Sequence, residues 1–242
     1  MAHLFFDLDR TLWHHERNHF RFFESLHGAR NWSEWGSSDA WAKSYLEIND
    51  RLWDHIQLHN LSVDYVRARR FPLLFRHMGL PVDRSKEFEV LGAECEQLLK
   101  MQLPDMGEGY NGVSEAFKAL REAGHQLHVV TNGVREPQRR KIAALGLSDF
   151  IEELVTSDVA RSYKPDPEIF HYALRSTGAQ AGESWMIGDS VLRDVLGGQA
   201  VGMRTAWFRA DDALPPDAEA TPDLEFRDWR EFPGLLEAAI RG

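Results

Sequence analysis

Apolar segments with the spacing of strands alternate with segments with the spacing of helices from residue 112 onward, and one earlier strand is expected at residues 4–6. The later strands are expected at residues 126–131, 151–156, 184–188 and 203–208. Helices are expected at residues 112–124, 137–145, 167–178, 191–200 and 233–241. Consecutive strands joined through helices favour right-handed crossovers and a parallel sheet covered on both faces. We therefore predict an α/β protein with a doubly wound, Rossmann-like sheet.

Residues 14–104 have a different pattern, with almost no strand signal and four expected helices. These helices are expected near residues 16–27, 39–58, 62–78 and 83–101. The second of them carries a stripe of apolar side chains, typical of a small bundle with its own core: Tyr45, Leu46, Leu52, Trp53 and Ile56. We therefore expect a core domain of residues 1–13 and 105–242, with a helical bundle of residues 14–104 inserted after the first strand.

The composition of the 242 residues is that of a globular protein, with 43% apolar residues and a formal net charge of −10. This charge argues against a nucleic acid polymer or an anionic membrane as a partner, because both favour a basic surface. Cys95 is the single cysteine, so no internal disulfide can form, which fits a reducing compartment. Neither a signal peptide nor an apolar stretch long enough to span a membrane is evident. We expect a cytoplasmic protein.

Polar residues of the kinds found in functional sites follow the expected strands. They are Asp7 and Asp9 after the first strand, Thr131, Asn132 and Gly133 at the second, Lys164 beyond the third, and Asp189 and Asp194 after the fourth. Taken singly, each group is explained as well by a turn, a helix start or a cap. Ligands of open parallel sheets, however, bind at the carboxyl ends of the strands, where these groups would meet. The pattern therefore indicates one shared site.

Four segments, in chain order, resemble the motifs of the haloacid dehalogenase (HAD) superfamily of phosphohydrolases: DLDRT (7–11), TNG (131–133), KP (164–165) and GDSVLRD (188–194). The resemblance covers essentially the whole chain, and it implies that the inserted helices form a type-one cap that closes over the active site. Residues 45–80 and the start of the chain resemble the pyrimidine 5′-nucleotidase-like branch. Arg10 stands where this family often has glycine, which puts the local loop geometry in question.

The resemblance implies roles for the acids after the first strand and for the TNG segment. Asp7 is the expected nucleophile, which would form an aspartyl-phosphate intermediate. Asp9 would donate a proton to the leaving ester oxygen and later take one from the attacking water. Thr131 and the backbone N–H groups of Asn132 and Gly133 would hold phosphate oxygens.

The acids of the expected site would repel one another by roughly 4 kcal/mol per pair at a separation of about 4 Å and an effective dielectric constant near 20, so a cation is expected among them. Oxygen ligands, and the family's own use of the ion, favour Mg²⁺. The expected protein ligands are the Asp7 carboxylate, the Asp9 carbonyl oxygen and the Asp189 carboxylate. Lys164 would add positive charge beside the nucleophile and the phosphoryl group. Asp194, with Ser190 near it, is expected to orient Lys164 or a metal-bound water, and an exposed helix acid is the alternative for Asp194.

Two pairs of histidines are weighed as further candidates. His55 and His59 have metal-ligand spacing on a helix but lack a third ligand, so a solvated helix face is expected. His14 and His15 are placed either at a hinge of the inserted bundle or on the surface.

Aromatic and basic residues of the inserted bundle also have two interpretations. Five Trp residues lie between positions 13 and 53, where they would stack on a nucleobase or, as we expect for most of them, fill the core. The RARR segment, residues 67–70, either directs one arginine at a substrate or forms a solvated cluster, which is the default expectation.

These observations together predict an Mg²⁺-dependent phosphomonoester hydrolase that acts through an aspartyl-phosphate intermediate on a small phosphorylated metabolite, namely a nucleoside 5′-monophosphate. A sugar-phosphate or phosphoglycolate-type phosphatase is the alternative enzyme, and a non-catalytic phospho-ligand binding protein is the alternative from another class. A receiver-type phospho-acceptor domain would be shorter and without the inserted helices. A dehalogenase of the same superfamily would have no use for a general acid at Asp9.

Overall fold

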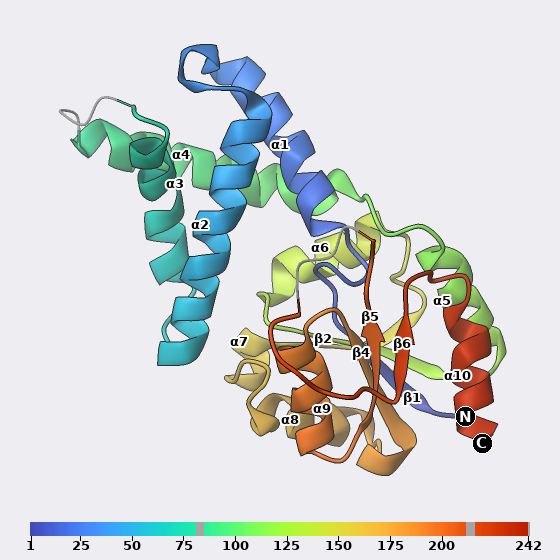
Figure 1. Cartoon of the computed structure of the whole chain (residues 1–242). Coiled ribbons are helices and arrows are strands. Elements are labelled where there is room, and N and C mark those ends of the chain that lie inside the picture. The colour runs from blue at the N-terminus through green and yellow to red at the C-terminus, as the bar shows by residue number, and fades with distance from the viewer. Residues whose placement is uncertain (81–84, 212–215, 242) are drawn as a thin grey trace. The chain divides into compact units, whose positions relative to one another are not determined.

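The computed structural model describes residues 1–80, 85–211 and 216–241 of the chain (Figure 1). The chain forms two compact units, Met1–His14 with Gly107–Gly242 and His15–Met106. The second unit is inserted in the first after its first strand, so the first unit is built from two separate stretches of sequence.

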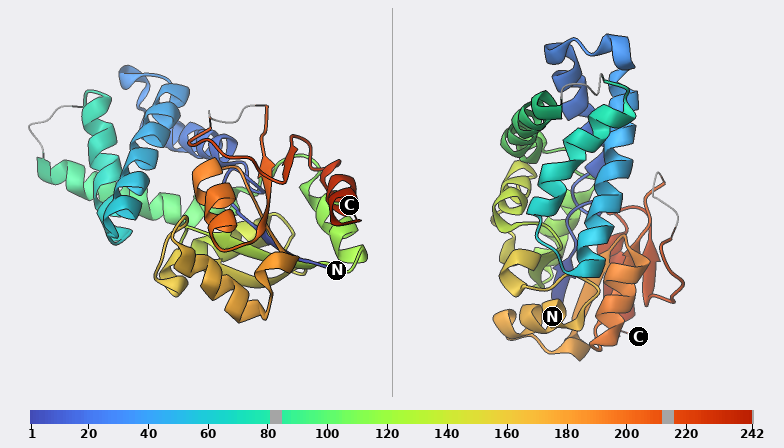
Figure 2. Two further views of the ribbon diagram at one scale, coloured as in Figure 1. Left: turned by 60° about the horizontal axis from the view of Figure 1, so that its bottom comes forward. Right: turned by 90° about the vertical axis from the view of Figure 1, so that its left-hand side faces the viewer.

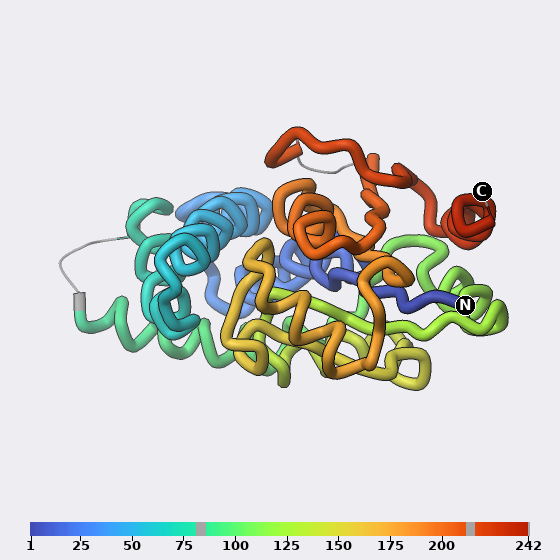
Figure 3. Tube along the Cα trace, turned by 90° about the horizontal axis from the view of Figure 1, so that it is seen from below, coloured from blue at the N-terminus to red at the C-terminus, as the bar shows by residue number. Residues whose placement is uncertain are grey.

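Six strands form one sheet in the first unit, and all neighbouring strands are parallel. They are β1 (His3–Phe6), β2 (Gln126–Thr131), β3 (Ile151–Thr156), β4 (Ser184–Gly188), β5 (Arg204–Phe208) and β6 (Leu224–Phe226). Their order is β3-β2-β1-β4-β5-β6, so the order reverses at β1, which lies between β2 and β4. Figure 3 shows β1, in blue, entering between later segments of this unit. This topology confirms the predicted doubly wound, Rossmann-like sheet.

Helices and short helical turns connect the strands. They are α5 (Val113–Glu122), α6 (Arg135–Ala144), α7 (Ser157–Ala160), α8 (Pro167–Thr177), η3 (Ala181–Glu183), η4 (Val191–Leu196), α9 (Gly197–Ala200) and α10 (Phe232–Arg241). In the ribbon views α5 and α10 lie side by side (Figure 2). The N-cap of α8 is the expected Asp166, whose side chain accepts a hydrogen bond from the Glu168 N–H.

The structure differs from the prediction at a few elements of this unit. Strand β6 and helix α7 are absent from the prediction, because three and four residues are too few to give a periodic signal. The helix expected at 191–200 is a π-helix, η4, followed by α9. Helix α6 begins at Arg135 rather than at residue 137, because proline is tolerated throughout the first turn, where N–H groups have no helical partner.

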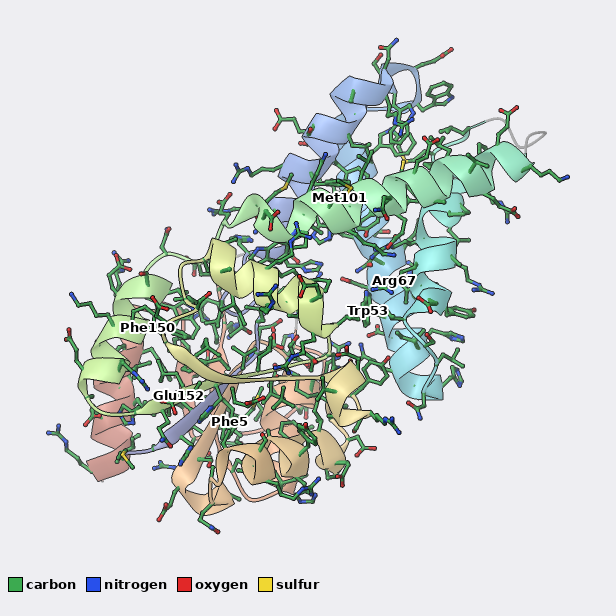
Figure 4. The ribbon with its side chains drawn as sticks, turned by 180° about the vertical axis from the view of Figure 1, so that it is seen from behind. Phe5, Trp53, Arg67, Met101, Phe150 and Glu152 are labelled. Atoms are coloured by element: carbon green, nitrogen blue, oxygen red, sulfur yellow. The ribbon has the colours of Figure 1, made fainter. Side chains whose placement is uncertain are left out.

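Consecutive residues of β1 supply the apolar cores on the two faces of the sheet. Phe5, labelled in Figure 4, packs in a cluster that includes Val130 of β2 and Phe170 of α8. Phe6 points to the opposite face, where its ring centroid lies 4.7 Å from that of Phe117 on α5. Both faces around β1 are therefore covered, and the strand is held in the centre of the unit.

Helices with an aromatic core form the second unit. Its described elements are α1 (His15–Arg30), η1 (Ser33–Trp35), α2 (Ser38–His59), α3 (Asp64–His77), α4 (Ser85–Gln102) and η2 (Leu103–Met106). Trp32 stacks on Trp41 with ring centroids 4.2 Å apart, and Tyr45 lies 4.9 Å from Phe23 and 5.4 Å from Phe71. Most of the Trp residues between positions 13 and 53 are buried, as expected: Trp32 and Trp41 in this unit, and Trp13 in the first unit.

The expectation of a solvated RARR cluster is wrong for Arg70. The Arg70 guanidinium is buried and donates two hydrogen bonds of 2.7 Å to the Glu96 carboxylate of α4 and one of 3.1 Å to the Asn49 side chain of α2. Arg69 is exposed and Arg67 is half-buried; Arg67 is labelled on α3 in Figure 4. Arg70 thus links three helices inside the unit, and its partners are distant in sequence, which is why the local charge pattern did not reveal it.

None of the helices in the described part of the chain combines the length and the apolarity needed to cross a membrane.

Candidate active site

Asp7 lies directly beyond β1, at the carboxyl end of the central strand. Its backbone N–H donates to the Ile187 carbonyl oxygen at 2.8 Å, which extends the pairing of β1 with β4 by one residue. The side chain is buried, with 7% of the residue exposed. Because the strand order reverses at β1, Asp7 occupies the position where open parallel sheets bind their ligands.

Lys164 brings together the acids that follow two different strands. Its Nζ lies 2.6 Å from Asp7 Oδ1 and 2.6 Å from Asp194 Oδ1, and all three side chains are at least nine-tenths buried. Burial alone would lower the pKa of the Lys164 ammonium, but the Asp194 and Asp7 carboxylates outweigh this effect and raise it. Lys164 is therefore held as a cation against Asp7, and Asp194 orients it.

Three carboxylates are crowded at this point of the sheet. One oxygen of each of Asp7, Asp189 and Asp194 lies within 4.8 Å of the others. Burial is the main cause that raises the pKa of Asp7 to about 6, with a further contribution from Asp194 against the opposing effect of Lys164. Burial, then Asp7 and Asp194, also raise the pKa of Asp189 well above its usual value. The donors are hard oxygen atoms carrying more negative charge than Lys164 balances, so the cluster fits a divalent cation such as Mg²⁺.

Thr11 connects the loop after β1 to the loop after β4. Its hydroxyl is fully buried, 3.3 Å from Asp7 Oδ2 and 3.2 Å from Asp189 Oδ1. The same oxygen accepts a hydrogen bond of 3.1 Å from the Asp189 backbone N–H. Thr11 ends the DLDRT segment and was not among the predicted site residues, yet its hydroxyl links the Asp7 and Asp189 carboxylates.

Arg10 adopts a left-handed conformation in this loop, with φ of 66°. Glycine reaches such a conformation without strain, whereas a residue with a Cβ atom is destabilised by roughly 1–2 kcal/mol. The Arg10 N–H donates to the Trp13 carbonyl oxygen at 2.9 Å, so the turn is closed despite the substitution. Although arginine replaces the glycine of the family pattern, the loop keeps the conformation that glycine would favour.

The TNG segment begins at the last residue of β2 and contacts the Lys164 loop through the Asn132 side chain. Asn132 Oδ1 accepts a hydrogen bond of 2.6 Å from the Lys164 backbone N–H, and Asn132 Nδ2 donates one of 3.0 Å to the Lys164 carbonyl oxygen. From the sequence, only the backbone N–H of Asn132 was expected to take part in the site, as a donor to phosphate. Its side chain in addition braces the backbone from which the Lys164 ammonium reaches Asp7.

The GDS segment after β4 is shaped by Asp194. A Cβ atom at Gly188 would lie 2.1 Å from Asp194 Oδ2, so only glycine leaves room for this carboxylate. Asp194 Oδ2 accepts a hydrogen bond of 3.0 Å from the Ser190 N–H. The Ser190 hydroxyl accepts from the Arg193 N–H at 3.0 Å and donates to Asp217 Oδ2 at 2.5 Å. Asp194 is thus buried beside Lys164 rather than exposed on a helix.

Two side chains of α6 complete the arrangement and were absent from the prediction. Gln138 Nε2 lies 2.8 Å from Asp9 Oδ2, and Lys141 Nζ lies 2.5 Å from Asp9 Oδ1. Asp9 is the more open of the two acids after β1, with 27% of its side chain exposed. The signal available in the sequence was the spacing of Gln138 and Lys141, which places both on one face of the helix that follows TNG.

The histidine candidates lie elsewhere. His55 and His59 are exposed on α2, as expected for a solvated helix face. His14 is buried, with its ring stacked 4.4 Å from that of Tyr110, so the surface interpretation is wrong for His14. Among the described residues, the only group of three acids, histidines or cysteines close enough to share a metal is Asp7, Asp189 and Asp194.

Comparisons with known proteins give the family. Residues 1–202 match the haloacid dehalogenase-like hydrolases. The pyrimidine 5′-nucleotidase PynA of Streptococcus pneumoniae is 26% identical over 240 residues, which are 98% of this chain and 95% of that protein. The glyceraldehyde 3-phosphate phosphatase of Pyrococcus abyssi is 33% identical over 199 residues, which are 68% of this chain and 80% of that protein.

Solved structures agree with the sequence relatives. The crystal structure of the HAD-hydrolase YfnB of Bacillus subtilis, bound to magnesium, superimposes with a TM-score of 0.81 at 26% identity and covers 98% of each chain. The resemblance expected from the four motifs is therefore confirmed. On the family match, the relatives and the fold together, the chain belongs to the haloacid dehalogenase-like hydrolases.

Proposed function

We propose that the protein is an Mg²⁺-dependent phosphomonoester hydrolase that uses Asp7 as its nucleophile. The observation that carries the proposal is the pairing of the buried Asp7 carboxylate with the Lys164 ammonium at 2.6 Å, beside Asp189 and Asp194 and at the carboxyl end of the central strand. The Lys164 ammonium would hold the Asp7 carboxylate in place, and a bound Mg²⁺ would add positive charge beside it. This arrangement suits attack on a phosphoryl group, because positioning and charge stabilisation supply most of the catalysis of phosphoryl transfer.

The first chemical step transfers the phosphoryl group to Asp7. An Asp7 carboxylate oxygen bonds to phosphorus as the bond from phosphorus to the ester oxygen breaks, and Asp9 gives a proton to that departing oxygen. Lys164 keeps Asp7 oriented and opposes the negative charge on the phosphoryl oxygens. The Thr131 hydroxyl, at the end of the neighbouring strand β2, donates to one of those oxygens.

The second step releases phosphate. Asp9, now a carboxylate, takes a proton from water as the water oxygen attacks phosphorus, and the bond between phosphorus and Asp7 breaks. Inorganic phosphate leaves, Asp7 returns to its starting form and Asp9 again carries the proton. The Asp9 side chain is 27% exposed, which suits a group that must reach both the leaving oxygen and the attacking water.

The divalent ion would be held by the Asp7 and Asp189 carboxylates and the Asp9 carbonyl oxygen, with Asp194 at the edge of the same cluster. When bound, it supplies positive charge that offsets the crowded acids and the phosphate. Support for this assignment comes from the crowding of the Asp7, Asp189 and Asp194 oxygens within 4.8 Å of one another, with Lys164 bonded to only two of these carboxylates.

We further propose a nucleoside 5′-monophosphate as the substrate, supported by the similarity to a pyrimidine 5′-nucleotidase over nearly the whole chain. The similarity to a glyceraldehyde 3-phosphate phosphatase favours a small sugar phosphate as the second candidate. In either case we assign the choice of substrate to the helical unit His15–Met106, because the residues to which we assign phosphoryl transfer belong to the other unit.

Hydrolysis of 4-nitrophenyl phosphate with and without Mg²⁺ tests the reaction. We expect turnover that depends on Mg²⁺ and a loss on the order of 10⁴-fold in kcat for Asp7→Asn, which keeps the shape of the side chain but removes the nucleophile. Asp149→Asn makes the same chemical change at an exposed turn and should leave kcat unaltered. Full activity of Asp7→Asn would remove the nucleophile assignment, and phosphate binding without any turnover by the wild type would favour a binding protein.

The substrate is tested separately, by kcat/KM over a panel of nucleoside 5′-monophosphates and sugar phosphates. A preference for the nucleotides supports the first candidate. A clear preference for sugar phosphates would replace it with the second while leaving the reaction itself intact.

A further inference from the structure

Two polar side chains of α6 are buried against the site, on a helix that is otherwise polar on its outer face. Gln138 and Lys141 are one turn apart, and the residues are 2% and 7% exposed, whereas the side chain of their neighbour Arg139 is 67% exposed. Burying an amide and an ammonium destabilises the folded state unless each is hydrogen-bonded. Their contacts should therefore explain why they are there.

Both side chains bind the carboxylate of Asp9, one at each oxygen. Lys141 Nζ lies 2.5 Å from Oδ1, and Gln138 Nε2 lies 2.8 Å from Oδ2. The Lys141 ammonium also lies 4.1 Å from the centre of the Trp13 ring, which restrains it from the other side. Two different donors, one at each oxygen, fix the rotation of the Asp9 carboxylate.

Gln138 also determines how Thr131 is oriented. Its Nε2 lies 2.8 Å from Thr131 Oγ1 as well as 2.8 Å from Asp9 Oδ2, so the two N–H bonds of one amide serve both residues. The reverse orientation of the amide would set its oxygen against the Asp9 carboxylate, which is repulsive. Thr131 Oγ1 accepts a further hydrogen bond of 3.3 Å from the Gly133 N–H. With both lone pairs occupied, the Thr131 hydroxyl has only its proton to offer, as a donor.

Gly133 makes room for this contact. A Cβ atom at Gly133 would lie 2.3 Å from Gln138 Nε2, and the backbone there is not in the left-handed region. A side chain at this position would displace the Gln138 amide, so glycine serves here for space rather than for conformation. Gly133 and the buried Gln138 of the next helix are therefore packed directly against each other.

We propose that Gln138 and Lys141 are positioning residues for phosphoryl transfer. They hold the Asp9 carboxylate where it exchanges a proton with the leaving oxygen, and Gln138 in addition fixes the Thr131 hydroxyl as a hydrogen-bond donor to the phosphate. This inference rests on the proposed function, which gives Asp9 the role of general acid and base.

The test is the dependence of kcat/KM on the leaving group, measured with 4-nitrophenyl phosphate, phenyl phosphate and an alkyl phosphate. For Gln138→Leu and Lys141→Met we expect losses of about 10²-fold with the alkyl phosphate, whose oxygen needs a proton to depart, and less than about tenfold with 4-nitrophenyl phosphate, which leaves as a stable anion. Lys141→Arg keeps the charge and should restore most of the loss. Arg139→Gln, on the exposed face of the same helix, should match the wild type for all three substrates.

A general disturbance of the site would lower kcat/KM by the same factor for every leaving group, and that outcome, or wild-type values in both variants, would overturn the inference. Thermal unfolding shows whether each variant folds. If Gln138→Leu does not fold, Lys141→Met tests the proposal independently. Asp7→Asn separates failure of the positioning role from failure of the proposed function. If Asp7→Asn is inactive and the α6 variants lose the same factor with every leaving group, only the positioning role is rejected. If Asp7→Asn is active, the proposed function itself is rejected.

Discussion

Several buried residues within the strands, or in the loops that follow them, are polar or titratable. Asp7, Thr131 and Lys164 are buried: Asp7 and Lys164 form an ion pair, and the Thr131 hydroxyl accepts a hydrogen bond from the Gln138 amide. His128, in the middle of β2, is equally buried, but its neighbours are a second histidine and an aromatic ring. Its Nε2 lies 3.2 Å from His3 Nδ1, and its ring stacks 4.8 Å from that of Phe5. Burial of this kind makes stability depend on pH.

His128 should destabilise the folded protein as the pH falls. Burial, then the neighbouring His3, lowers the pKa of His128 to about 4, whereas an unfolded histidine titrates near its usual value of 6.5. Between these values the unfolded chain binds more protons, so the free energy of unfolding decreases as the pH drops through the window, by roughly 3 kcal/mol in total. The stabilisation is complete above the unfolded pKa and is lost toward the folded one.

The measurement is urea unfolding of the wild type and His128→Leu at several pH values between about 7.5 and about 4.5. The stability of the wild type relative to the variant should fall by about 2–3 kcal/mol over this range. His171→Gln, at an exposed position of α8, should follow the wild-type profile. A constant difference between wild type and His128→Leu would show that His128 does not titrate in this window.

Among the elements, α3 and α4 are joined by a buried ion pair. The Arg70 and Glu96 side chains are 10% and 8% exposed, and two hydrogen bonds of 2.7 Å connect them. The burial of Arg70 lowers the pKa of its guanidinium, but Tyr45 and Glu96 outweigh burial, so the net shift is upward. The two buried charges compensate each other while both are present, and removal of one leaves the other uncompensated in an apolar interior.

Arg70→Met and Glu96→Met should each destabilise the helical unit by about 3–5 kcal/mol, because each removes the main counter-charge of a buried ionised side chain. The double variant Arg70→Met/Glu96→Met should be destabilised by less than the sum of the single changes, since it removes both charges. Amide hydrogen exchange in α3 and α4 measures the effect within this unit. Arg69→Gln, on the exposed side of α3, is the matched control. Additive single effects would contradict the coupling.

The elements also show which features a single sequence reveals. The long strands and helices of the first unit were predictable, because their apolar residues recur with a clear period. Strand β6 was not, since Leu224–Phe226 is fixed by a tertiary contact, the packing of Phe226 on Phe208 at 5.2 Å, rather than by its own pattern. The π-helix η4 likewise depends on Asp194, whose carboxylate is drawn to Lys164 from a different loop.

For the whole molecule, the sheet order explains why the site was largely predictable. Parallel strands bring their carboxyl ends to one edge, so Asp7, Thr131, Lys164 and Asp189 could be expected to meet once the strands were known. The contacts of α6 could not, because they depend on how the helix is rotated against the sheet, and the sequence REPQRRKIAA is polar on nearly every side. Which of its polar residues face inward is decided by Asp9, more than a hundred residues earlier in the chain.

The central claim, that Asp7 receives the phosphoryl group, is tested most directly by trapping the intermediate. Enzyme in excess over substrate is mixed with Mg²⁺, quenched with acid during the first turnover and digested, and the peptides are analysed by mass spectrometry. The account predicts phosphate on the peptide that contains Asp7, formed together with the departing alcohol and absent from Asp7→Asn. Release of alcohol and phosphate with no phosphorylated peptide, or phosphate attached to another residue, would contradict it.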